Sequence, residues 1–343
     1  MQIIIPAGGL GTRMRPHTHI RPKPLIPVAG KPSIAHILDT LAVLRIEKVV
    51  LVTGRDGEKL LEYVTEHYPY PTVAVEQKVM RGQSDALLLA EPEIDPEGGV
   101  LIAFVDTLFE ADLSALAGLE EADGAAFVKQ VPDPSRFGVA VSDARGYVTR
   151  LVEKPKEPVS HDALVGLYYF KCSGQLYAAI HEQMERKLML KNEYFLADAV
   201  GLMVEQGAKI KVLPVSVWED TGTIDALLHS NRYLLRKSGV TGPQEPYIQG
   251  NALIIPPVAL AADVMLENSV IGPYVSLGQG VAVTDSVVRD SIIADKARVT
   301  ASVLSGSVIG ERASVDGAYQ KLNLSDDSGI SAQPQAAIDE TFK

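Results

Sequence analysis

The sequence has 343 residues, a formal net charge of -11 and a single cysteine, Cys172. The length predicts more than one domain, and 46% hydrophobic residues are ample material for packed cores. An acidic chain without a basic run argues against nucleic acid or a membrane surface as partner, and one cysteine excludes an intrachain disulfide and multi-thiolate zinc sites. With no apolar run near the roughly 18 residues of a membrane helix and no signal-peptide pattern, we expect a cytoplasmic protein.

The chain opens with the apolar run 1–5, which predicts a buried first strand. It leads into the segment 6–28, PAGGLGTRMRPHTHIRPKPLIPV, in which Gly8, Gly9 and Gly11 would let a phosphate or a base approach the main chain. The segment matches neither a P-loop nor the dinucleotide fingerprint. From these residues alone, a tight strand-to-helix turn is an equal alternative to an anion site.

Two cations accompany this loop. Arg13 offers a fork of donors, and Lys23 lies between Pro22 and Pro24, which restrict the backbone on either side of it. We expect both side chains to be held toward the loop.

Up to about residue 237, strand-like and helix-like stretches alternate. This alternation predicts an α/β fold: a Rossmann-like, mostly parallel sheet with helices on both faces and ligands at the carboxyl ends of its strands. The expected strands are 48–54, 72–77, 100–106, 124–131, 163–170 and 209–215, and the expected helices are 32–45, 85–92, 173–187, 195–207 and 224–237.

Two carboxylates follow expected strands of this domain, Asp106 after VLIAFV and Asp220 in WEDTGT. Each by itself is a common helix-cap or turn residue. Together, beside a phosphate loop, they suit Mg²⁺, which binds through one or two carboxylates plus substrate phosphates. Gln77 and Gly82 also follow a strand, and an amide matches the adjacent carbonyl and N–H of a pyrimidine, although an exposed Gln and a turn Gly are the ordinary interpretation.

After residue 250, aliphatic residues recur every five or six positions from Ile254 to Val315, with turn-forming residues between them. This hexapeptide period predicts a triangular solenoid of about four coils over 251–317, similar to a left-handed parallel β-helix. We expect 238–250 to be a linker, and 318–343 to be a polar tail that is loose or ordered only by a neighbouring subunit.

The strings GGLGTRMRP, RPKPLIPV and GKP strongly resemble the signature of the sugar-1-phosphate nucleotidyltransferases, in the branch with glucose-1-phosphate thymidylyltransferases. The resemblance implies a magnesium ion on Asp106 and Asp220 and a thymine or uracil read by Gln77 and Gly82. It further implies a sugar phosphate whose hydroxyls meet Glu153 and Glu193 and whose phosphate meets Lys154. The remaining implied contacts are, for the nucleotide, Pro6, Gly8, Gly9, Gly11 and Thr12, and, for the sugar, Gly138, Leu164 and Gly166.

The implied reaction joins dTTP or UTP to a sugar-1-phosphate, favoured as glucose-1-phosphate, and releases pyrophosphate. Arg13, Lys23 and Lys154 are the expected catalytic cations. A non-catalytic, nucleotide-sugar-binding regulatory subunit of the same fold is the competing hypothesis. A third, in which the β-helix is an acetyltransferase, is disfavoured because the solenoid is short and offers no obvious base, so we expect it to mediate homo-oligomer assembly instead.

Overall fold

A computed structural model describes residues 1–237 and 245–331. The chain divides into two compact units that do not follow the sequence order. Unit 1 comprises 1–10 and 34–219, and unit 2 comprises 11–33 and 220–343. The first glycine loop is therefore divided between them, and each unit is built around its own core.

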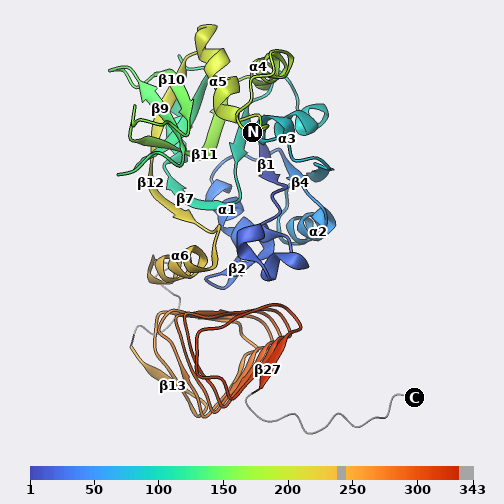
Figure 1. Cartoon of the computed structure of the whole chain (residues 1–343), viewed down its shortest axis with the longest axis vertical. Helices are drawn as coiled ribbons and strands as arrows, with labels where there is room; N and C mark the ends of the chain where they lie inside the picture. The colour runs from blue at the N-terminus through green and yellow to red at the C-terminus, as the bar shows by residue number, and fades with distance from the viewer. Residues whose placement is uncertain (238–244, 332–343) are drawn as a thin grey trace, which may run out of the picture. The chain divides into compact units, whose positions relative to one another are not determined.

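Unit 1 is organised on a sheet of ten strands (Figure 1). They are β1 (Gln2–Ala7), β4 (Lys48–Thr53), β5 (Thr72–Glu76), β6 (Val100–Ala103), β7 (Thr107–Ala111), β8 (Gly124–Gln130), β9 (Gly138–Ser142), β10 (Val148–Glu153), β11 (Asp162–Phe170) and β12 (Ile210–Asp220). The order is β5-β4-β1-β6-β11-β8-β12-β7, and β9 joins β10 to β11. Strands β5, β4, β1 and β6 are parallel, whereas β11 is antiparallel to β6 and β8. The predicted mixed, mostly parallel sheet is confirmed.

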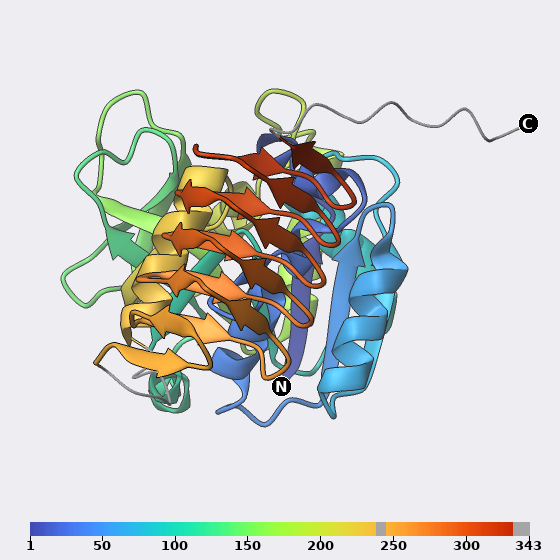
Figure 2. The same cartoon turned by 90° about the horizontal axis from the view of Figure 1, so that it is seen from below.

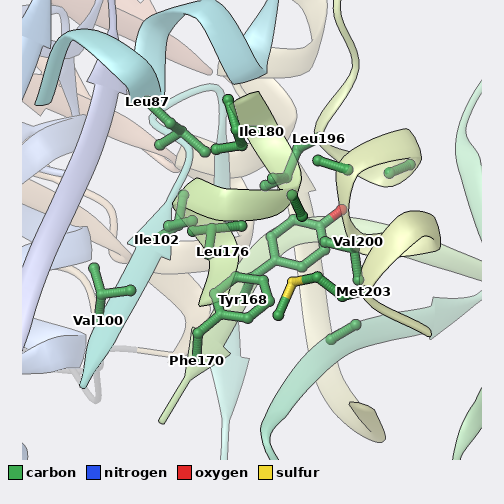
Figure 3. Packing of buried hydrophobic residues seen from close by; sticks show 14 of the residues in the cluster. Leu87, Val100, Ile102, Tyr168, Phe170, Leu176, Ile180, Leu196, Val200 and Met203 are labelled. Atoms are coloured by element: carbon green, nitrogen blue, oxygen red, sulfur yellow. The ribbon is translucent and has the colours of Figure 1, made fainter. Parts of the chain in front are cut away.

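Helices α1 (Ser33–Leu41), α2 (Gly57–His67), α3 (Gln83–Ala90), α4 (Ser173–Glu185) and α5 (Leu196–Glu205) accompany this sheet, with 3-10 turns η4 (Glu91–Glu93) and η5 (Leu113–Gly118). The apolar faces of α3, α4 and α5 pack on the sheet, and Figure 3 shows Leu176, Ile180 and Val200 against Tyr168 and Phe170. Helix α2 and strands β7, β9 and β10 were not predicted. Within the described ranges, no helix has the length and apolarity to cross a membrane.

The C-terminal part of unit 2 is the predicted left-handed β-helix, triangular in cross-section (Figure 1) and stacked coil on coil (Figure 2). Its three stacks have five strands each, and the twelve strands between 252 and 316 make the four coils that we expected. One stack contains β13 (Tyr247–Gln249), β14 (Ala252–Ile254), β17 (Val270–Ile271), β20 (Val287–Arg289) and β23 (Val303–Ser305). The second contains β15 (Val258–Leu260), β18 (Val275–Leu277), β21 (Ser291–Ile293), β24 (Val308–Ile309) and β26 (Asn323–Leu324). The third contains β16 (Met265–Glu267), β19 (Ala282–Thr284), β22 (Arg298–Thr300), β25 (Ser314–Asp316) and β27 (Gly329–Ser331).

The periodic aliphatic residues fill the solenoid interior, as the pattern predicted. Ile254, Ile271, Val288 and Leu304 are fully buried at successive levels of one stack. Buried serines connect the levels at a corner, because the hydroxyl oxygen of Ser286 accepts the backbone N–H of Ser302 at 3.0 Å. A hydroxyl can satisfy a buried main-chain donor where the strand ladder is interrupted.

The limits of the solenoid differ from the expectation. Strand β27 continues the third stack beyond residue 317, where we expected a polar tail, because Val315 pairs in parallel with Ile330. Strand β13, inside the expected linker 238–250, lies antiparallel to β14. The remaining parts of the predicted linker and the predicted tail, 238–244 and 332–343, lie outside the described residues.

The remainder of unit 2 is the signature segment 11–33 with helix α6 (Ile224–Lys237). The segment forms η1 (Thr12–Met14), η2 (His17–His19), η3 (Lys23–Leu25) and a short hairpin of β2 (Pro27–Val28) and β3 (Lys31–Pro32). It is fastened to the solenoid: Arg21 pairs with Glu311, and the ring Nε2 of buried His17 lies 2.6 Å from the Oδ1 atom of Asn323. Burial lowers the pKa of His17, so its neutral form is favoured there.

Candidate active site

In unit 1, the glycine loop begins where β1 ends. Pro6 is still in the strand, paired with Val52, and Gly8 is buried. A Cβ atom on Gly8 would stand 3.1 Å from the Oε1 atom of Gln77, so a side chain there would crowd this amide. A Cβ on Gly9 would meet nothing within 4 Å, and the surface of the loop there is open.

Gln77 and Gly82 come together beyond the end of β5. The Nε2 atom of Gln77 donates to the Gly82 carbonyl at 3.3 Å and to the Oδ2 atom of Asp85 at 3.0 Å. Gly82 has φ of 111°, and a Cβ there would stand 2.4 Å from the backbone nitrogen of Tyr194. Only glycine fits both the left-handed backbone and this close approach. The loop of Gln77 is thereby attached to the segment that carries Glu193.

Four of the residues implied for the sugar phosphate lie close together. Strands β9 and β10 place Gly138 opposite Glu153, and a Cβ on Gly138 would stand 2.7 Å from the Glu153 Oε2 atom and 3.0 Å from the Cδ1 atom of Leu164. The Nζ atom of Lys154 lies 3.1 Å from Glu153 Oε1 and 4.3 Å from the ring centre of Phe195. Lys154 has φ of 46°, which turns it toward the same side as its neighbour instead of alternating with it.

The pKa of the Glu153 carboxyl group is shifted by its surroundings. Burial raises the pKa of Glu153, the Lys154 ammonium opposes the shift, and the carboxylates of Asp198 and Glu193 add to it. Burial also raises the pKa of Asp198. Desolvation and like charge disfavour the ionised forms of these carboxyl groups, so the group favours a ligand that brings hydroxyl donors.

Gly166 lies in β11, and Asp106 lies in the turn that follows the neighbouring strand β6. A register shift interrupts the pairing of β11 with β8 between Leu164 and Tyr168, and Gly166 sits inside it with φ of 79°. A Cβ there would stand 2.9 Å from the ring of Phe104. The backbone N–H of Phe104 donates to the Gly166 carbonyl at 2.9 Å. Asp106 follows β6 by three positions and is exposed.

In unit 2, Gly11 and Lys23 are neighbours, since a Cβ on Gly11 would stand 3.4 Å from the Lys23 Cβ and 2.8 Å from a methyl of Thr18. Gly11 has φ of 58°, and exposed Thr12 begins η1 directly after it. Exposed Arg13 and Asp220 meet at Gly222, where a Cβ would stand 2.8 Å from the Arg13 Nη2 atom and 2.7 Å from Asp220 Oδ1.

Asp106 in unit 1 and Asp220 in unit 2 each offer carboxylate oxygens, the donors that a hard divalent cation prefers. Asp106 lies in the turn between β6 and β7, Asp220 is the last residue of β12, and both are exposed. One oxygen of Asp220 accepts the Gly222 N–H at 2.6 Å. In the ranges 1–237 and 245–331, no cluster of three or more His, Cys, Asp or Glu side chains could hold an ion by protein groups alone.

The sequence analysis did not single out Asp85, which is 3% exposed and contacts Gln77, or Gly222, which lies between Arg13 and Asp220. The spacing WEDTGT gave a signal for Gly222, two residues after the predicted metal ligand. The sequence gave no such signal for Asp85, because an Asp in the first turn of a helix is common and is explained by the helix dipole.

Comparisons with known proteins identify the family of the chain. The model of the nucleotidyl transferase family matches residues 2–237. The UTP–glucose-1-phosphate uridylyltransferase AglF of Haloferax volcanii is 31% identical over 224 residues, 64% of this chain and 89% of that protein. A glucose-1-phosphate thymidylyltransferase of Streptomyces antibioticus is 28% identical over 351 residues, 92% of this chain and 93% of that one.

Among solved structures, a UDP-glucose pyrophosphorylase complexed with UDP-glucose superposes with a TM-score of 0.61 at 22% identity, over 69% of this chain and 98% of that one, which supports the fold. The chain therefore belongs to the nucleotidyl transferase family, which confirms the predicted class of enzyme, the sugar-1-phosphate nucleotidyltransferases.

Proposed function

We propose that this protein joins dTTP or UTP to glucose-1-phosphate, with magnesium, and releases pyrophosphate. A phosphate oxygen of the sugar phosphate attacks the α-phosphorus of the triphosphate, the bond from that phosphorus to the bridging oxygen breaks, and the pair of electrons leaves with pyrophosphate. The attacking phosphate is already ionised at neutral pH, so no general base is needed. Catalysis then consists of positioning and charge neutralisation.

The observation that carries this proposal is the group around Gly138. Glu153, half-buried and with a raised pKa, lies beside the Lys154 ammonium at 3.1 Å, and only a glycine at position 138 lets the Glu153 carboxylate take this place. A carboxylate that accepts hydroxyls, next to a cation that attracts a phosphate, is what a sugar phosphate requires. The Leu164 side chain offers no polar atom, which favours glucose-1-phosphate over an N-acetylated sugar phosphate.

The charges of the signature segment complete the proposal. Arg13 and Lys23 neutralise the triphosphate, and Asp106 and Asp220 hold the magnesium ion, which would stabilise charge on the phosphate oxygens. Support for the nucleotide comes from the names of the two relatives, one a uridylyltransferase and one a thymidylyltransferase.

The test is pyrophosphate release by the full chain with magnesium and glucose-1-phosphate, offered dTTP, UTP, GTP, CTP and ATP separately. We expect release with dTTP or UTP. Lys154→Met should lower kcat/KM for the sugar phosphate by about 100-fold or more, as removal of a preorganised charge contact does. Lys156→Met, two residues further on at an exposed position, is the matched control and should stay near the parent value. Silence with all five nucleotides, or equal losses in both variants, would refute the assignment.

We also propose that the protein acts in the cytoplasm as a homo-oligomer assembled through the β-helix. A single cysteine suits a reducing compartment. The first coils expose Ile248 (73%) and Met265 (60%), large apolar side chains that an interface would cover. Light scattering of the parent and of Ile248→Lys would test the assembly, and an unchanged mass in the variant would contradict this choice of surface.

A further inference from the structure

Gln77 is a buried amide that is satisfied on only one side. Its side chain is 5% exposed, and both of its hydrogen bonds are donated by Nε2, to the Gly82 carbonyl and to the Asp85 carboxylate. Its Oε1 atom accepts no hydrogen bond from any residue in the described parts of the chain. An acceptor at the edge of a mostly buried side chain, with no protein donor, is available to a ligand that brings an N–H or O–H group.

The orientation of this amide follows from chemistry. Carboxylate and carbonyl oxygens can only accept, so both neighbours require the NH₂ side of Gln77 to face them. Asp85 is 3% exposed and is itself held, because its Oδ1 atom lies 2.6 Å from the Arg81 Nη2 atom. A 180° flip of the amide would place Oε1 against two acceptors, one of them charged. The flipped state is therefore strongly disfavoured.

The free oxygen faces the first glycine loop. It lies 3.1 Å from the position that a Cβ on Gly8 would take, and the glycine leaves that space open. A planar group with an N–H could approach Oε1 along this side. Uracil and thymine carry such an N–H at ring position 3, whereas cytosine has a bare lone pair at the same place.

We propose that Asp85 is a positioning residue for base selection: by fixing the amide of Gln77, it turns the base site into an acceptor that admits uracil and thymine and rejects cytosine. The inference rests on the proposed function, in which the base of the nucleotide lies beside Gln77. It explains why a buried aspartate stands in the first turn of α3 and faces β5 instead of solvent. Guanine also carries a ring N–H, so this amide does not discriminate against it.

The test measures binding of UDP and CDP to the full chain with magnesium by calorimetry, so that it is independent of turnover. Parent protein should prefer UDP by about tenfold or more, the value of one well-placed hydrogen bond against a lone-pair clash. Asp85→Asn keeps the shape but offers either an NH₂ or an oxygen to Gln77, so the amide can turn, and the preference should fall to within about threefold. Arg81→Gln is the matched control: it removes the ion pair but leaves both acceptors of Gln77, and should keep the preference.

A folded Asp85→Asn variant that discriminates as well as the parent would overturn the inference. If that variant does not fold, Asp85→Ser replaces it, because a hydroxyl can also donate or accept, and the same loss of preference is expected. Pyrophosphate release with UTP but equal binding of UDP and CDP would overturn the role of Asp85 and leave the proposed function standing. A preference for UDP that depends on Asp85, in a protein that turns over no nucleotide, would overturn the proposed function and leave the role of Asp85 standing. A parent protein that binds neither UDP nor CDP would overturn both proposals.

Discussion

Replacing Asn231 tests how the signature segment is held in unit 2. Asn231 lies in α6, is fully buried, and makes three hydrogen bonds to partners far apart in the sequence. Its Oδ1 atom accepts from the backbone N–H of Ala29 at 2.8 Å and from the hydroxyl of Ser276 at 2.7 Å, and its Nδ2 atom donates to the Tyr274 carbonyl at 3.2 Å. One side chain thus joins the β2–β3 turn, α6 and the solenoid.

The expected cost of Asn231→Ala follows from these bonds. Each buried hydrogen bond contributes about 1 kcal/mol net, so three lost bonds amount to about 3 kcal/mol. The partly buried Ala29 N–H also loses its acceptor and the smaller side chain leaves a void, which raises the total to about 4 kcal/mol. This is a large fraction of the 5–15 kcal/mol that typically stabilise a domain.

Urea unfolding followed by circular dichroism would measure the global loss, and hydrogen exchange at the Ala29 amide the local one. Asn251→Ala is the matched control, because Asn251 bonds to Asn268 on the exposed outside of the solenoid and should cost less than about 0.5 kcal/mol. If Asn231→Ala destabilises the protein no more than this control, or if the Ala29 amide stays equally protected, the three bonds do not hold the segment.

Three further changes probe unit 1 and the metal. Asp106→Asn should reduce turnover by a few kcal/mol of transition-state stabilisation with an unchanged melting temperature, and an Asn variant as active as the parent would exclude Asp106 as a metal ligand. Gly82→Ala should lower both stability and nucleotide affinity, because the new Cβ would stand 2.4 Å from the Tyr194 nitrogen; a melting curve identical to the parent's would contradict this. Since burial raises the pKa of Glu153 above its ordinary 4.5, the ionised carboxylate costs stability at higher pH. Glu153→Gln should therefore melt above the parent at pH 7 and lose this advantage as the pH falls below about 4, and a parent that melts higher at pH 7 would reverse the sign.

The predictable part of the fold was the part with strong periods. The long apolar runs predicted the central strands of the sheet, and the hexapeptide spacing predicted the solenoid. Helix α2 was not predicted because only Leu60 and Val64 of it are buried, and the rest of its sequence is typical of a polar surface segment. Strands β9 and β10 escaped because they form a short hairpin whose outward residues, such as Thr149 and Arg150, are exposed and carry no core signal.

Within the site, the sequence supplied the residues but not their surroundings. The residues Gln77 and Gly82 could be proposed from the sequence. Which side of the Gln77 amide is available to a ligand, however, depends on a hydrogen bond to Asp85, the third residue of α3. The pKa of Glu153 likewise depends first on how deeply the end of β10 is buried and, to a smaller extent, on nearby charges such as Asp198 of α5. Burial and through-space charge are properties of the packed chain, and neither is encoded in local spacing.

The least predictable feature is where the signature segment belongs. In sequence it follows the first strand of the sheet, and we expected it to be part of a domain ending at residue 237. In the structure its contacts within unit 2 are made by side chains about 300 positions away: Arg21 pairs with Glu311 and also lies 3.7 Å from Asp326, and His17 meets Asn323. The pair Arg21–Glu311 is half-buried, and breaking it by removing one partner would leave a poorly solvated charge. The solenoid therefore stabilises the turns that carry Arg13 and Lys23, so that a substitution in its last coils can alter the predicted phosphate-binding cations without touching them.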